Sequence, residues 1–175
     1  AVPPTPTAIG PCEIIADQAV DVYQRPSREA GIFGTLDPSF RPLALARTPD
    51  AAWIGFDPAV AQAANVGVFR LRWVAADSVR LEGGCDVLEV VEGPPPGVCF
   101  TMPMEETTVY AAPAPDANAL VTLVPGDYTA VTGIYGDDWA QVDLDVGSLA
   151  TGGQGWVEAT TLNLNGPCDL PDVIP

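Results

Sequence analysis

The sequence predicts an all-β protein made of two small β-barrels in tandem. Three observations support this fold class. A set of landmark residues occurs twice, in the same order, along the 175 residues of the chain. Most of each copy consists of short segments rich in Val, Thr, Tyr and Trp, in which apolar and polar residues alternate as they do in half-buried strands. A run of prolines separates the two copies.

The landmarks are Cys12, Tyr23, Trp53, Trp73 and Cys85 in the first copy, and Cys99, Tyr110, Trp139, Trp156 and Cys168 in the second. The first cysteine precedes the tyrosine by 11 residues in both copies, and a V-Y-x-x-P motif surrounds each tyrosine. The next tryptophan follows after 30 residues in one copy and 29 in the other, and the last cysteine follows the second tryptophan by 12 residues in both. Spacings this similar indicate a tandem repeat of two units of about 75 residues each.

The segment "EGPPPGVC", residues 92–99, marks the boundary between the copies. Three successive prolines lack backbone donors and favour a stiff, extended path, which is typical of a short linker. The predicted organisation is an extended N-terminal arm (1–11), a first barrel (12–92), the linker (93–98), a second barrel (99–168) and a C-terminal tail (169–175).

The candidate strands of the first copy are "AVDVYQRP", "GIFGTL", "RPLALAR", "AWIGFD", "VFRLRWV" and "SVRLEG". Those of the second copy are "TTVYAAP", "ALVTLVPG", "YTAVTGIY", "DWAQVDLDV", "QGWVEA" and "TTLNL". Short strands with long hairpin loops, in so few residues, favour a small barrel over a sandwich. Only "DPAVAQAANVG", residues 57–67, has the alanine content of a helical turn, and we predict an insertion loop there.

The second copy contains, in order, V-Y-x-x-P, "ALVTLVPGD", "DDWAQVD" and "GQGWVEATTL". Over residues 107–164 this order resembles the bacterial SH3-like domain. The first copy retains Tyr23, Pro26, "GTLDPS", Trp53 and "RWVAADSV", but Arg72 stands where the family has glycine. The arginine that the family usually has after the valine is Tyr23 or Tyr110 here, so ligand contacts made through that arginine do not transfer to this chain.

The resemblance also bears on the four cysteines, because the chain ends of SH3-like barrels lie close together. Of the three ways to pair four cysteines, only Cys12–Cys85 with Cys99–Cys168 gives both copies the same cross-link. Four reduced thiols in a cytosolic protein are one alternative, and zinc ligation is another, although no two of the cysteines stand two to four residues apart. If the disulfides form, the protein belongs in an oxidising compartment, at the cell surface or outside the cell.

The composition excludes several functional classes. Seven Arg and no Lys stand against 23 acidic residues, and the formal charge of -16 would repel nucleic acids and anionic lipids. Without His or Lys the chain cannot build a Ser-His or Cys-His pair, a His-ligated zinc site or a Schiff base. Glycosidase chemistry, which needs only two carboxylates, is compatible with this composition but has no further support in the sequence. We therefore expect no enzyme, no cofactor, no nucleic-acid partner and, without a long apolar run or leader, no membrane insertion.

Aromatic residues outside the repeated core motifs are candidates for a groove that binds an extended peptide. They are Tyr23, Trp53 and Phe56 in the first copy and Tyr110, Tyr128, Tyr135 and Trp139 in the second. The alternative is that they pack the cores, as Trp73 and Trp156 are expected to do.

The acidic segment "GDDWAQVDLDVG", residues 136–147, allows two interpretations. Asp143 and Asp145 are expected on one face of a strand, where their oxygens could bind Ca²⁺. The alternative, which we favour, is a solvated edge strand whose charges oppose aggregation.

The two ends of the chain, "AVPPTPTAIGP" and "CDLPDVIP", have the composition of extended arms. One or both could dock on a neighbouring subunit, or on the chain's own barrel. The resemblance to bacterial SH3-like domains implies a non-catalytic module of the bacterial cell surface that recognises a cell-wall polymer or a protein. The second hypothesis is a structural subunit of an extracellular filament or surface assembly, in which copies of the chain are held together by these arms.

Overall fold

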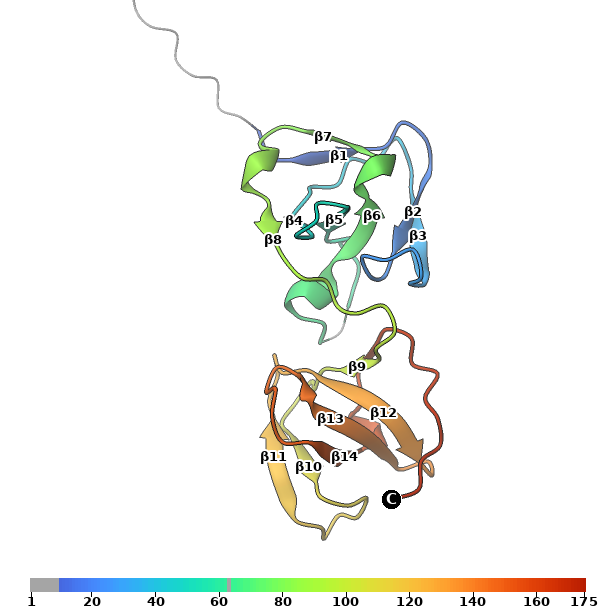
Figure 1. The fold of residues 1–175 in the computed structure, drawn as a ribbon, viewed down its shortest axis with the longest axis vertical. Helices are drawn as coiled ribbons and strands as arrows, with labels where there is room; N and C mark the ends of the chain where they lie inside the picture. The colour runs from blue at the N-terminus through green and yellow to red at the C-terminus, as the bar shows by residue number, and fades with distance from the viewer. Residues whose placement is uncertain (1–9, 63) are drawn as a thin grey trace, which may run out of the picture. The chain divides into compact units, whose positions relative to one another are not determined.

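The structure is a computed structural model, which describes residues 10–62 and 64–175 (Figure 1). The described residues are all-β, with only short 3-10 turns besides the strands. Within them the chain divides into two compact units. The first unit comprises residues 10–60 and 71–93, and the second comprises residues 61–70, apart from residue 63, and 94–175.

The strands of the first unit are β1 (Glu13–Ile15), β2 (Val20–Tyr23), β3 (Ile32–Leu36), β4 (Ala46–Arg47), β5 (Trp53–Phe56), β6 (Arg72–Ala75), β7 (Arg80–Glu82) and β8 (Glu89–Val90). Six of them form one sheet in the order β3-β2-β6-β5-β4-β8, and β1 pairs with β7. Short 3-10 turns, η2 (Ala76–Ser78) and η3 (Cys85–Val87), follow β6 and β7.

The second unit begins with the 3-10 turn η1 (Gly67–Arg70). Its strands are β9 (Phe100–Thr101), β10 (Thr107–Tyr110), β11 (Ala119–Leu123), β12 (Thr129–Tyr135), β13 (Trp139–Gly147), β14 (Gln154–Glu158) and β15 (Leu164–Asn165), with η4 (Ala159–Thr161) between the last two. They form one sheet in the order β11-β10-β14-β13-β12-β9-β15.

The all-β prediction is confirmed, whereas the closed barrels are not. In the described residues neither large sheet pairs its two outermost strands: β3 and β8 remain edges in one, β11 and β15 in the other. Closure requires continuous pairing around the whole circumference. Strands as short as β4 and β8, with two residues each, provide too few backbone bonds for it.

The two units repeat the same strand pairing residue by residue. Val22 pairs with Gly34 in the first unit, and Val109 pairs with Val121 in the second. Each hairpin then has a one-residue bulge before its tyrosine pairs on its other side with the buried tryptophan, Tyr23 with Trp73 and Tyr110 with Trp156. A bulge turns the strand locally and is a specified feature of a fold. The sequence repeat is therefore also a structural repeat.

Each unit has its own apolar core. The first is built from Cys12, Ile14, Ala16, Val20, Val22, Leu36, Ala44, Ile54, Phe56 and Val74. The second is built from Cys99, Val109, Leu123, Val131, Ala140, Val142, Leu144 and Val157. Trp73 and Trp156 are also buried, as expected for the core tryptophans.

The predicted disulfides are present. Cys12 is bonded to Cys85 and Cys99 to Cys168, with Cα–Cα distances of 4.7 and 4.9 Å. Each bond joins the residue just before the first strand of the unit's sequence repeat (β1 or β9) to a residue just after the strand that pairs with it (β7 or β15), so both units carry the same cross-link.

The predicted insertion loop (57–67) is divided between the units: residues 57–60 belong to the first, whereas residues 61–70, apart from residue 63, belong to the second. Phe69 from η1 is buried there, and its ring centroid lies 5.1 Å from that of Phe100 and 4.8 Å from that of Tyr128. The physical reason is burial, because removing the aromatic side chain from water contributes more free energy than the ordering of the loop costs.

The C-terminal tail lies on its own unit. Ile134 of β12 pairs in parallel with Asp172, and its backbone carbonyl accepts a bond from the Val173 N–H at 2.7 Å. In the first unit β8 pairs in parallel with β4, and both segments start four residues after the second cysteine. The tail is thus the repeat equivalent of β8. The predicted N-terminal arm falls on residues 1–11, of which 1–9 lie outside the described residues.

Candidate functional site

A tyrosine–tryptophan pair occupies the same place in each unit. The rings of Tyr23 and Trp53 meet edge to face with centroids 5.4 Å apart, and those of Tyr110 and Trp139 do so at 5.8 Å. This is a favourable geometry for aromatic rings. Both tryptophans begin a strand and are only half buried, so each presents part of its indole to solvent.

A shallow hollow opens beside each exposed indole. In the first unit, the hollow, of about 300 Å³, is lined by Arg28, Ala51, Ala52, Trp53, Ala75, Ala76 and Asp77. In the second, it has about 320 Å³ and is lined by Pro115, Asp138, Trp139, Glu158 and Thr160. We call these the first and second aromatic hollows. Their walls come from matching loops and strands, since Trp53 pairs with Ala75 and Trp139 with Glu158.

The two hollows differ in charge. In the first, an ion pair between Arg28 and Asp77, with 3.1 Å between guanidinium nitrogen and carboxylate oxygen, balances one charge with another. In the second, Asp138 and Glu158 are both acidic, and no base lines the hollow. The second hollow therefore favours a cationic group over its indole, where carboxylates and a cation–π contact would act together.

The hairpin turn before Trp53 fixes the position of its indole. The Trp53 backbone N–H donates to the Thr48 hydroxyl at 3.2 Å, and the Thr48 N–H donates to the Trp53 carbonyl at 3.1 Å. The Asp50 carboxylate accepts from the Thr48 hydroxyl and, at 3.0 Å, from the Ala52 N–H. The Thr48 hydroxyl bond, helped by the Ala52 N–H bond, holds the pKa of Asp50 below its ordinary value.

We expect this turn to loosen in acid. Because the pKa of Asp50 is lowered in the folded state, its contribution is fully present above the pKa of the unfolded chain and is lost as the pH falls through the folded value. An NMR titration of the carboxylate carbon should give a midpoint below that of an ordinary aspartate. Thr48→Val removes the donor while keeping the shape of the side chain, and should move the midpoint upwards. An unchanged midpoint in Thr48→Val would show that the hydroxyl does not hold the carboxylate.

The second unit positions Trp139 by a tight turn between β12 and β13. Tyr135 pairs with Trp139 at the end of the hairpin, and Gly136 has a φ of 59°, in the region that glycine adopts most readily. The Asp138 carbonyl accepts from the Ala159 N–H at 2.7 Å, which joins the turn to η4. This backbone hydrogen bond thus fixes the position of Asp138, one of the two acidic residues of the second hollow.

Two of the five groove candidates, Trp53 and Trp139, line the hollows. Tyr23 and Tyr110 pack against these indoles but do not line the hollows, and Tyr23 is buried. Tyr128 packs in the aromatic cluster with Phe69 and Phe100. Of the other aromatic residues considered, Phe56 is buried in the first core and Tyr135 packs against Trp156, with ring centroids 6.1 Å apart.

The calcium candidates are engaged in turn contacts. The Asp143 carboxylate accepts from the Asp145 N–H at 3.0 Å, and the Asp145 carboxylate accepts from the Gly153 N–H at 3.3 Å. Among residues 10–62 and 64–175, no three acidic, cysteine or histidine side chains gather in a way that could hold a metal ion. Nor does any helix in these ranges have the length and apolarity needed to cross a membrane.

Sequence reasoning missed three polar residues of the hollows, Arg28, Asp77 and Glu158, and considered Asp138 only as part of the acidic segment 136–147. The repeat could have indicated two of these positions, because residues that line the hollows stand at equivalent places in the two copies. Arg28 and Pro115 each lie five residues after the tyrosine, and Ala75 and Glu158 each lie two residues after the core tryptophan. No protein-family model and no curated protein matches this chain.

Proposed function

We propose that the protein is a non-catalytic binding module of the bacterial cell surface that recognises an extended polymer or peptide through its two aromatic hollows. The observation that carries this proposal is the recurrence of the same half-exposed indole, edge-on to a tyrosine and beside a hollow, in both units. Aromatic walls of this kind suit extended, weakly polar chains. Two aromatic sites on one chain would also raise the avidity for a repetitive polymer.

The resemblance to bacterial SH3-like domains is part of this proposal. It is supported by the order of the motifs in the sequence and by hairpins that repeat with the same register and bulge. In this interpretation each unit is a partly open variant of the small barrel. The tyrosines that replace the family's arginine pack edge to face against the tryptophans of the hollows, so the ligand would stack on the indoles that they support.

The proposed location is the cell surface or the surrounding medium. Two disulfides are consistent with an oxidising compartment, because cytosolic thiols are kept reduced. A charge of -16 keeps such a module soluble and away from anionic lipids. It also favours polymers that carry amino groups, which fits the acidic second hollow.

A pull-down on purified cell wall tests this function. We expect Trp53→Ala and Trp139→Ala each to weaken binding by roughly tenfold, since a stacked indole contributes about 1.4 kcal/mol or more. Phe40→Ala is the matched control, because this aromatic side chain is 51% exposed and lines neither hollow. Retention of the wild-type affinity by both tryptophan variants would remove the hollows as the binding sites.

The second candidate function is a structural subunit of an extracellular assembly. It is favoured by a separate observation, an open apolar depression in the first unit together with an exposed isoleucine in the C-terminal tail. Sedimentation of the full chain over a range of concentrations separates the two candidates, because the binding module remains a monomer and the subunit does not.

A further inference from the structure

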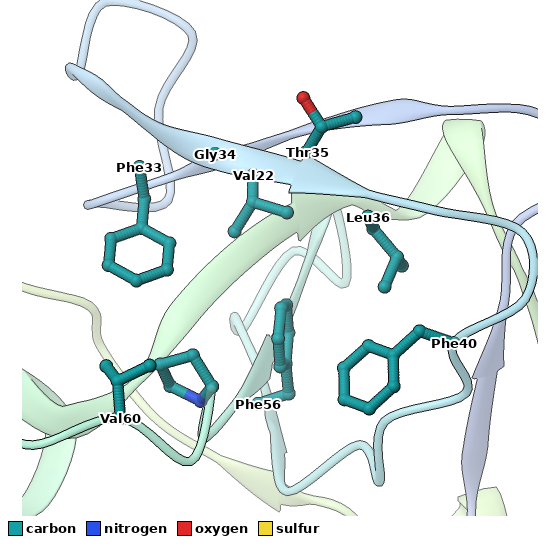
Figure 2. Close-up of a pocket in the computed structure, with 9 residues that line it drawn as sticks. Val22, Phe33, Gly34, Thr35, Leu36, Phe40, Phe56 and Val60 are labelled. Atoms are coloured by element: carbon teal, nitrogen blue, oxygen red, sulfur yellow. The ribbon is translucent and has the colours of Figure 1, made fainter.

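An apolar depression lies beneath β3 in the first unit, away from the first aromatic hollow (Figure 2). Its lining residues are Val22, Phe33, Gly34, Thr35, Leu36, Phe40, Phe56, Pro58 and Val60, and its volume is about 190 Å³. In Figure 2 the side chains of Val22, Phe33 and Leu36 extend from the strands toward those of Phe56, Phe40 and Val60, while Thr35 points away. We call it the apolar pocket. Phe40 is 51% exposed, so part of this surface faces water without cover in the isolated chain.

The comparison of the two repeats explains why the pocket is open. Gly34 of β3 pairs with Val22, and at the same register position in the second unit Val121 pairs with Val109. Val121 packs against the core of its unit. At Gly34, a Cβ atom would meet no other atom within 4 Å. The second repeat thus carries an aliphatic side chain where the first repeat leaves space.

This difference indicates the chemistry of the occupant. The lining is apolar apart from one threonine that points away, so burying a polar group there would cost free energy. A dry cavity of roughly 150 Å³ holds a molecule as large as benzene. The pocket is therefore large enough for one branched aliphatic side chain, the same kind that the second repeat places at this position.

The chain itself carries such a side chain in an unusually exposed position. Ile174 is 94% exposed, yet the residues before it are held, because Pro171 and Val173 bond to the backbone of β12. An anchored segment loses less conformational entropy on binding than a free one. Ile174 is thus presented to a partner on a fixed support.

Charge distinguishes between the possible contacts of two copies. The first unit holds six arginines against 12 acidic residues, whereas the second holds Arg70 alone against 11. Arg41, whose side chain is 54% exposed, follows the pocket residue Phe40 and lies 3.9 Å from carboxylate oxygens of Glu13 and Glu82. Contact between the first unit of one copy and the acidic tail of another therefore brings fewer uncompensated negative charges together than contact between two second units.

We propose that Ile174 of one copy inserts into the apolar pocket of a second copy. The pocket and Ile174 lie in different units of each chain, so the contact is of the head-to-tail kind and can continue from copy to copy. This inference rests on the second candidate function and names its interface. It does not involve the aromatic hollows, so wall binding and self-association succeed or fail separately.

Sedimentation equilibrium of the full chain at increasing NaCl tests the proposal. Self-association of the wild type should strengthen with salt, because screening reduces the repulsion between chains of charge -16. Ile174→Asp should weaken it by about 30-fold, from the lost burial of one isoleucine side chain. Val87→Asp is the matched control, since Val87 is 87% exposed and lies outside the contact. Gly34→Val, which fills the pocket as Val121 does in the other repeat, should abolish association without lowering the free energy of unfolding.

Mixing the variants gives the decisive result. Gly34→Val keeps Ile174 but has no pocket, and Ile174→Asp keeps the pocket but has no isoleucine to fill it. Each variant alone should associate far more weakly than the wild type, while an equimolar mixture should form heterodimers and nothing larger. The proposal is overturned if the wild type stays monomeric at every salt concentration, if Val87→Asp weakens association as much as Ile174→Asp, or if folded Gly34→Val associates like the wild type.

Discussion

Removing either disulfide should lower the free energy of unfolding of its unit by up to about 4 kcal/mol. The bonds close loops of 73 and 69 residues, and in the chain-entropy treatment the stabilisation depends on loop length alone. The two losses should therefore be nearly equal. A unit of this size starts with only a few kcal/mol of net stability, so each variant should be marginally folded at best.

Chemical denaturation of Cys12→Ala/Cys85→Ala and of Cys99→Ala/Cys168→Ala measures these losses. Alanine is the appropriate replacement, because Cys12 and Cys99 are buried and a serine hydroxyl there would need a partner. The wild type under a reductant should unfold like the variant that lacks all four cysteines. Unfolding midpoints that match the oxidised wild type in both double variants would contradict the stabilising role of the cross-links.

The pairing of the cysteines could be predicted because the repeat supplied a constraint beyond composition. Cys12 and Cys99 stand at the same distance from their tyrosines, and Cys85 and Cys168 at the same distance from their tryptophans. Only one pairing treats both copies alike, and the structure contains it. Periodicity and β-forming residues likewise indicated the strands, so the all-β class followed from local properties.

Closure of the sheets and the fate of residues 61–70 were beyond such reasoning. Whether β3 pairs with β8 depends on the tilt and stagger of all strands of the sheet together, and no single sequence motif specifies these. The sequence of the alanine-rich loop did not indicate which unit it packs on. The contact depends on one residue, Phe69, whose partners Phe100 and Tyr128 lie far along the chain. Long-range burial of a single aromatic side chain leaves no periodic pattern.

The candidate site could be predicted in its aromatic part and not in its polar part. Trp53 and Trp139 stood out because the repeat separated them from the core tryptophans. Arg28 and Asp77, by contrast, are 49 residues apart and meet only through the fold. The apolar pocket could not be predicted either, because it results from the absence of a side chain at Gly34.

Gly83→Ala should destabilise the first unit by an amount on the order of 3 kcal/mol. Gly83 has a φ of 100°, which alanine adopts only with strain, and a Cβ there would lie 2.1 Å from the carbonyl oxygen of Pro11. That oxygen belongs to the backbone just before Cys12, so it cannot withdraw without displacing the disulfide. Both the backbone strain and the steric clash therefore act against the folded state.

Gly34→Ala is the matched control in the same unit, because its Cβ meets no atom within 4 Å, and its unfolding free energy should change by less than about 1 kcal/mol. Gly166 is the repeat equivalent of Gly83, two residues before the second cysteine, and has a φ of 112°. Gly166→Ala should thus destabilise the second unit through backbone strain. Denaturation curves in which Gly83→Ala and Gly34→Ala unfold at the same midpoint would contradict this account, since the two differ only in the conformation and surroundings of the glycine replaced.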